Sequence, residues 1–522
     1  MKSAVLALCV LLPVTTAQAA PLSPYATIAE QQTAIAAGTA SAQSLTRAYL
    51  GRIAAMNHAG PRLNAVLAVN PDALATARAA DLLRSVRGPL FGAGILQKDN
   101  IETADKTATT AGSLALKANV TGRDAPLVAR LRGAGAIVLG KANLSEWANF
   151  RSSNSVSGWS AVGGLVRNPY SLDRTACGSS SGSAVAVAAG LAAGAIGTET
   201  DGSVICPAAL NGVVGLKPTL GLVSRTRIVP ISPEQDTAGP IARTVADAAL
   251  ILDAIAGSDP LDPATRDADI RRTPYRAGLD AKSLQGTRIG VLRTYAGRSP
   301  RTDAVFDDAL AALRAQGAVL VELKGPDEAT LTRLGVLEGA ALRAEFRPAL
   351  EAYLANAALA VNARALPDLI AFNATDPRET ALFGQETFAV AVAAKPQEEA
   401  RNTVRKLARD TLDDLLRDAK AEVLVTPSGG PAGLVDPING LKSLGSPTSL
   451  PAVAGYPHLT VPMGYISGLP VGLSFIGPAW TDGRLLSLGY AFEQATHARR
   501  APTFPASINP AAGFARAYDP GP

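Results

Sequence analysis

The chain contains 522 residues, of which 47% are hydrophobic and only 18% are charged. This composition is typical of a globular enzyme with a large buried core and excludes a disordered or fibrous chain. The formal net charge is +5, and the basic residues form no stripe with interleaved aromatics, so no nucleic-acid partner is expected. The length predicts two or three domains, or one unusually large one.

The first 19 residues have the pattern of an export signal. Lys2 is the charged start, residues 4–14 form the apolar stretch, and residues 17–19 (AQA) form a small-residue cleavage site. This apolar stretch is well short of the roughly 20 residues that cross a bilayer, so no stable membrane anchor is expected. We therefore predict a mature chain of residues 20–522 that is exported to the periplasm or secreted.

Apolar periodicity predicts helices that alternate with strands along the mature chain, which indicates the α/β class. In the first half, helices are expected over residues 28–56 with a break near Gly38, 72–85, 125–133 and 144–150, and strands over 62–69 and 136–139. Residues 257–277 form a polar connection. Beyond it, strands are expected over 288–292, 318–323, 423–426, 459–463 and 471–476, and helices over 304–315, 331–374 and 398–418.

Few residues in this chain are suited to bind a metal ion. The only histidines are His58, His458 and His497, and neither HExxH nor CxxC occurs. No metal site and no cofactor are therefore predicted. Outside the signal, the cysteines are Cys177 and Cys206, for which an oxidising compartment permits a disulfide. Two thiols in so large a chain are more often small buried apolar residues, which is the interpretation we favour.

One motif has two possible interpretations. Residues 178–182 (GSSSG) match the G-x-S-x-G elbow, so Ser180 and His458 could belong to an α/β-hydrolase esterase. That elbow requires a strand immediately before it, and residues 168–174 are polar and contain Pro169. The esterase is kept as a distant alternative.

Three segments are better explained together: residues 94–100 (GILQKDN), 177–183 (CGSSSGS) and 197–203 (GTETDGS). Alone, the lysine would be a solvated surface charge and the serines a loop or helix cap. In this order and at this spacing they resemble the amidase signature family. Supporting matches run from about Leu45 to residues 455–457 (GYP) and 468–472 (GLPVG), so the resemblance covers nearly all of the mature chain.

The resemblance implies one α/β domain over residues 20–522, built on a large mixed sheet covered by helices on both faces. Its catalytic core would span residues 85–255 and a C-terminal α/β portion residues 286–500. Ser203 would be the nucleophile, Lys98 the base, and Ser179 the bridging serine, preceded by a cis peptide bond.

The chemistry of this triad is coherent without the resemblance. A serine hydroxyl is a weak nucleophile, and a lysine can take its proton only while the lysine is neutral, which burial favours. The backbone amides of Thr200, Asp201, Gly202 and Ser203 would form the oxyanion hole, where a single donor contributes about 3 kcal/mol.

The predicted substrate is a small-molecule or peptide amide. Two positions differ from the usual family pattern: Ile205 stands where the family often has Arg, and Asp201 where Gly is frequent. Together with residues 143–150 and 215–219, these positions resemble the bacterial peptide amidase branch of the family. That branch removes the C-terminal amide of peptides. Trp147 and Phe150 are candidate substrate contacts or simply core aromatics.

Other substrates and other functions remain as alternatives to a peptide amidase. Fatty-acid amides and aryl acylamides are the second substrate class. A distant alternative is that the protein has the amidase fold but binds a ligand without catalysis. A transamidosome-type protein that passes ammonia to a partner is disfavoured, because export would separate it from cytoplasmic tRNA. Nothing in the sequence sets an oligomeric state.

Overall fold

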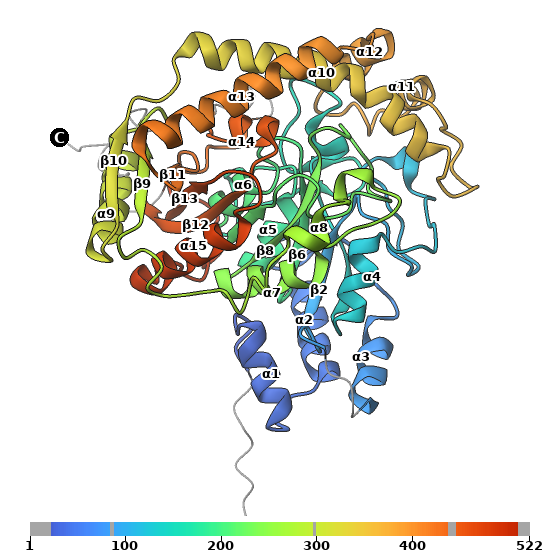
Figure 1. The fold of residues 1–522 in the computed structure, drawn as a ribbon. Coiled ribbons are helices and arrows are strands. Elements are labelled where there is room, and N and C mark those ends of the chain that lie inside the picture. Colours follow the sequence, from blue (N-terminus) through green and yellow to red (C-terminus); the bar gives the residue numbers. More distant parts are fainter. Residues whose placement is uncertain (1–21, 84–87, 296–298, 437–444, 510–522) are drawn as a thin grey trace, which may run out of the picture.

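The computed structural model describes residues 22–83, 88–295, 299–436 and 445–509. Within these ranges, eleven strands form one mixed sheet with helices packed on both faces (Figure 1). The predicted α/β fold with a large mixed sheet is therefore confirmed. The predicted signal segment, residues 1–19, lies outside the described residues.

The sheet has the strand order β1-β3-β2-β6-β8-β7-β12-β13-β11-β9-β10. Strand β2 is parallel to β3 and β6, β9 is parallel to β10 and β11, and the other neighbours are antiparallel. Two short strands, β4 and β5, pair separately. The bounds are β1 Val66–Val69, β2 Gly94–Lys98, β3 Ile137–Ala142, β4 Trp159–Ser160, β5 Gly164–Leu165, β6 Gly194–Glu199, β7 Val214–Lys217, β8 Thr237–Ala242, β9 Arg288–Leu292, β10 Val319–Leu323, β11 Val423–Pro427, β12 His458–Ile466 and β13 Leu469–Ile476.

The helices α1, α2 and α3 lie at one end of the molecule, and α10 and α13 lie side by side at the opposite end (Figure 1). None of the helices in the described ranges is long and apolar enough to cross a membrane. The bounds are α1 Ile28–Ala36, α2 Ala42–Met56, α3 Ala73–Leu82, α4 Pro126–Gly133, α5 Ser181–Ala188, α6 Ile205–Leu210, α7 Val245–Ile255, α8 Ala268–Arg271, α9 Pro300–Ala315, α10 Glu328–Leu354, α11 Leu366–Thr375, α12 Glu386–Ala393, α13 Glu398–Ala419, α14 Ser449–Ala454 and α15 Asp482–Thr496.

Two strands that the periodicity did not predict, β2 and β6, are neighbours in the interior of the sheet. Every residue of β2 (GILQK) and of β6 (GAIGTE) is buried, because helices cover both faces there. A strand buried on both faces shows no alternation of apolar and polar residues. Between these strands in sequence, helix α5 is also buried at every position.

One predicted helix is divided in the structure. Residues 331–374 were expected to be helical, yet α10 ends at Leu354 and α11 begins at Leu366. The Arg364 side chain donates to the carbonyl oxygens of Leu354 at 2.8 Å and Ala358 at 2.9 Å. These bonds hold the non-helical segment that follows Leu354 against the start of α11.

The predicted helix over residues 144–150 is reduced to a 3₁₀ turn, Glu146–Asn149. Trp147 and Ala148 have φ values of 48° and 53°, in the left-handed region. The Trp147 N–H donates instead to the carbonyl oxygen of Ala111 at 2.8 Å. This tertiary hydrogen bond replaces the continuation of the helix.

The close packing of α5 gives a testable prediction for stability. A Cβ at Gly182 would lie 2.5 Å from the backbone oxygen and 2.6 Å from the backbone nitrogen of Asn143. Gly182→Ala should therefore lower the unfolding temperature, with a cost of about 1–3 kcal/mol from overpacking. Gly51→Ala is the matched control, because a Cβ there meets nothing within 4 Å in the middle of α2. That control should be neutral or stabilising by up to about 1 kcal/mol; equal unfolding temperatures for both variants would contradict the prediction.

Candidate active site

The carboxyl ends of β2 and β6 meet at the same edge of the sheet because the two strands are parallel neighbours. Lys98 ends β2, and Thr198 lies one residue before the end of β6. The Lys98 Nζ lies 2.8 Å from Thr198 Oγ1, 3.1 Å from Thr198 O and 2.7 Å from Ser179 Oγ. The sheet therefore brings together two of the predicted triad residues, which are 81 positions apart in sequence.

The Lys98 side chain is completely buried. Burial lowers the pKa of Lys98 to about 7, while the negative charges of Asp236 and Glu199 oppose this shift. Within the described residues, Lys98 forms no ion pair, and the groups in contact with its amine are hydroxyl and carbonyl oxygens. A substantial share of this lysine is therefore neutral near pH 7 and able to accept a proton.

The chain passes through α5 and β6 between Ser179 and Ser203. Ser179 is completely buried and Ser203 is 7% exposed. The Ser180 N–H donates to the Ser203 carbonyl oxygen at 3.1 Å, which ties the two serine-bearing segments together. The peptide bond between Gly178 and Ser179 is cis, as the resemblance implies.

The loop that leads from β6 to Ser203 is held from within by Glu199. Its Oε2 accepts hydrogen bonds from the backbone N–H groups of Val204 at 2.7 Å and Ile205 at 3.0 Å. Gly202 has a φ of 74° in the left-handed region, which glycine adopts without strain. Within the described residues, the N–H groups of the four predicted donors, residues 200–203, have no protein acceptor, so they remain candidates for an oxyanion hole.

A cavity of about 680 Å³ adjoins this site. Asn100, Thr198 and Thr200 form part of its wall, and both Lys98 and Asn100 hydrogen-bond to Thr198 Oγ1. An apolar part of the wall comes from residues 228–233 and from α10, and another part carries charged side chains, among them Arg123, Arg225 and Arg227. The cavity can therefore hold the part of a substrate that extends away from the reacting bond.

The two aromatic residues predicted as substrate contacts are not on the wall of this cavity. Trp147 is 3% exposed, and its ring centroid lies 5.8 Å from that of Phe388. The Phe150 ring lies 4.8 Å from that of Phe346. Both pack in a hydrophobic cluster, as the alternative interpretation expected, and only their neighbour Ala148 reaches the cavity wall.

The two cysteines form a disulfide, which corrects the expectation of two separate buried thiols. Cys177 precedes Ser179 by two residues, and Cys206 follows Ser203 by three. Composition statistics could not reveal this pairing, because it depends on the fold bringing the start of α5 and the start of α6 together. The bond is a covalent link between the segments that carry the two serines.

The alternative site of Ser180 and His458 is not assembled. The Ser180 hydroxyl donates to Thr198 O at 3.1 Å, and His458 Nε2 lies 2.7 Å from Ser474 Oγ. His458 is in β12, three strands away from β6 in the sheet, which corresponds to roughly 14 Å. Burial lowers the pKa of His458 to about 3. In the described ranges, no group of three or more His, Cys, Asp or Glu residues is arranged to hold a metal ion.

Comparisons with known proteins agree with this architecture. A model of the amidase family matches residues 44–486. The solved structure of the peptide amidase from Stenotrophomonas maltophilia has a TM-score of 0.86 and 49% identity, and the match covers 92% of this chain and 99% of that one. A probable amidase of Arabidopsis thaliana is 40% identical over 501 residues, which are 92% of this chain and 91% of that protein. A glutamyl-tRNA(Gln) amidotransferase component from Roseiflexus castenholzii is 36% identical over 494 residues, covering 90% and 96%.

The fold and these similarities define an enzyme that hydrolyses amides. More narrowly, the chain belongs to the amidase family.

Several site residues were not singled out from the sequence. Asn100, Thr198 and Glu199 lie within the quoted motifs, so their positions were visible while their roles were not. Asp236, whose charge acts on Lys98, lies in a segment with no motif at all. Only the tertiary structure places these groups around the buried amine.

The pKa of Lys98 predicts the pH dependence of the reaction. Because the amine acts as a base only when neutral, kcat/KM should rise with pH through a midpoint near 7 and level off above it. Lys98→Met should lose most of the activity and this acid limb, whereas exposed Lys406→Met should keep both. Rates measured from pH 5 to 9 test this; an unchanged limb in Lys98→Met would assign the ionisation to another group.

The disulfide gives a second prediction. Denatured, unreduced protein prepared without residues 1–19 should contain no thiol that reacts with a thiol reagent, because Cys177 and Cys206 are paired. A reductant should lower the unfolding temperature and kcat of the natural enzyme, because the two serine segments lose their covalent link. The double variant Cys177→Ser/Cys206→Ser should start from lower values and not respond to reductant. Two reactive thiols in the unreduced protein would refute the pairing.

Proposed function

We propose that the protein removes the C-terminal amide of peptides and releases ammonia, with Ser203 as nucleophile, Ser179 as proton relay and Lys98 as base. The observation that carries this proposal is the 2.7 Å contact between Lys98 Nζ and Ser179 Oγ, both of which are completely buried. The similarity to a solved peptide amidase at 49% identity supports the substrate class.

The contacts of Lys98 Nζ are consistent with a neutral amine. A neutral amine has two N–H donors and one lone pair. Thr198 O can only accept, so one N–H must point to it, and Thr198 Oγ1 can take the second. The lone pair is then left for the Ser179 hydroxyl, which can donate its proton along the 2.7 Å contact.

In the proposed reaction, Ser203 Oγ attacks the carbonyl carbon of the terminal amide. Its proton passes to Ser179 while the Ser179 proton passes to Lys98. The negative charge that forms on the carbonyl oxygen is stabilised by the free N–H groups of residues 200–203. The protons then return along the same path to the amide nitrogen, which leaves as ammonia, and water hydrolyses the acyl group from Ser203.

Export to an oxidising compartment belongs to the same proposal. The Cys177–Cys206 disulfide supports it, because such bonds persist mainly in exported proteins. The pattern of residues 1–19 supports it independently. An exported enzyme would meet peptides or small amides and not aminoacylated tRNA, although amidotransferase components are among its relatives.

The substrate class can be tested by ammonia release. Purified enzyme should release one ammonia from each C-terminally amidated peptide and none from the same peptide as a free acid. Ser203→Ala should lower this rate by at least about 1,000-fold, because the acyl-enzyme cannot form. Turnover of a fatty-acid amide or an acyl anilide, with no ammonia from any peptide amide, would replace peptide amides with the second substrate class.

A further inference from the structure

The wall of the cavity next to the proposed triad contains three arginines, and two of them are neutralised. Arg123 makes two hydrogen bonds to the Glu102 carboxylate, at 3.0 and 2.9 Å. Arg225 makes two to the Asp262 carboxylate, at 2.9 and 2.5 Å. All four of these side chains line the cavity, so their charges cancel in pairs.

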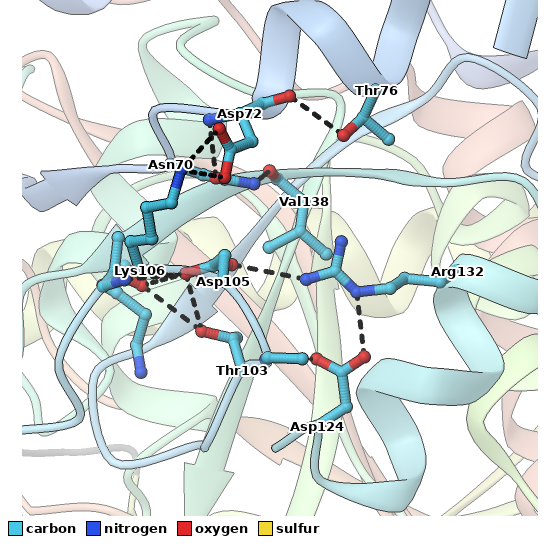
Figure 2. Close-up of polar contacts among 12 residues, drawn as sticks. Asn70, Asp72, Thr76, Thr103, Asp105, Lys106, Asp124, Arg132 and Val138 are labelled. Atoms are coloured by element: carbon cyan, nitrogen blue, oxygen red, sulfur yellow. Dashed lines mark hydrogen bonds and ion pairs between the residues drawn. The ribbon is translucent and has the colours of Figure 1, made fainter. Parts of the chain in front are cut away.

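The third arginine, Arg227, has no carboxylate partner within the described residues. One guanidinium nitrogen donates to the backbone oxygen of Asp124 at 2.7 Å. The Asp124 carboxylate is already occupied, because it accepts from Arg132 Nε at 3.0 Å and from the Ala104 N–H at 2.7 Å (Figure 2). Arg227 is half-buried and belongs to the cavity wall, and within the described residues no carboxylate neutralises its guanidinium.

The remaining acid on the wall does not balance this charge. Asp236 directs its carboxylate to the Thr200 hydroxyl at 2.6 Å and to the N–H groups of Ile231 at 2.7 Å and Ser232 at 2.9 Å. Its negative charge acts on Lys98 and on Arg225. An apolar wall strengthens the attraction between Arg227 and an anion, because the local dielectric constant is lower than that of water.

The backbone path between Lys98 and Arg227 is short. The segment that carries it runs antiparallel to the chain leaving β2: the Val229 N–H donates to Asn100 O at 2.8 Å, and the Glu102 N–H to Arg227 O at 3.1 Å. Lys98 and Glu102 are four residues apart, which is at most about 14 Å of extended chain. The arginine side chain itself covers part of this span. An extended peptide in the cavity covers the remainder with about one to three residues upstream of the reacting carbonyl.

We propose that Arg227 is a specificity-determining residue that binds an acidic group of the substrate. The acid would be an Asp or Glu side chain, or a free carboxylate, one to three residues upstream of the amide that is cleaved. This inference rests on the proposed function, because it takes the cavity as the site of the acyl portion. Arg227 belongs to none of the three motifs in the sequence.

The test compares peptide amides that differ only in Glu against Gln, placed in turn at each of three upstream positions. With the natural enzyme, kcat/KM for ammonia release should be about tenfold higher for Glu than for Gln at one position, mainly through KM. In Arg227→Gln this ratio should fall to about one, and in Arg227→Lys it should be intermediate. The ratio is internal to each enzyme, so a partly misfolded preparation does not alter it.

Exposed Arg333→Gln on α10 is the matched control, since it removes the same charge away from the cavity and should keep both activity and ratio. Increasing salt should lower the Glu/Gln ratio of the natural enzyme. If neutral peptide amides are hydrolysed but the ratio is one at every position, or survives in Arg227→Gln, the role of Arg227 is overturned and the proposed function stands. If no peptide amide releases ammonia, both are overturned.

Discussion

The site depends on the burial of one amino group, that of Lys98, where the carboxyl ends of β2 and β6 meet. Another buried lysine shows what is particular about it. Lys141 lies 3.4 Å from the Asp99 carboxylate, which compensates its charge. Within the described part of the chain, the Lys98 amine contacts hydroxyl and carbonyl oxygens but no carboxylate, and burial brings its pKa to about 7. A charged lysine is costly in such a setting, so the fold suits Lys98 to the role of base that we propose for it.

Several bonds around this amine hold together the two segments that carry Ser179 and Ser203. The disulfide links Cys177 to Cys206, the Ser180 N–H binds the Ser203 carbonyl, and Glu199 fixes the turn from inside. These three kinds of bond act on the same short stretch of structure. Together they hold the segments of the proposed nucleophile and relay close to each other, and such positioning favours reaction between groups in an enzyme site.

Charges are handled differently on the cavity wall and around the proposed triad. Around the amine, charge is removed by burial, whereas on the cavity wall it is cancelled by pairing, with Arg227 as the exception. An enzyme that accepts many amides needs little more than an apolar wall. In our proposal, the unpaired guanidinium of Arg227 makes the cavity prefer acidic substrates, and the catalytic groups do not set this preference.

The sequence by itself determined the fold class, the family and the three candidate catalytic residues, because short motifs in a given order carry that information without any knowledge of contacts. It missed β2 and β6, since strands buried on both faces show no alternation, and it expected a helix where Trp147 bonds to Ala111. Only the tertiary structure decided the burial of Lys98, the disulfide and the unpaired state of Arg227. Each of these depends on residues that lie far apart in sequence and become neighbours through the order of strands in the sheet.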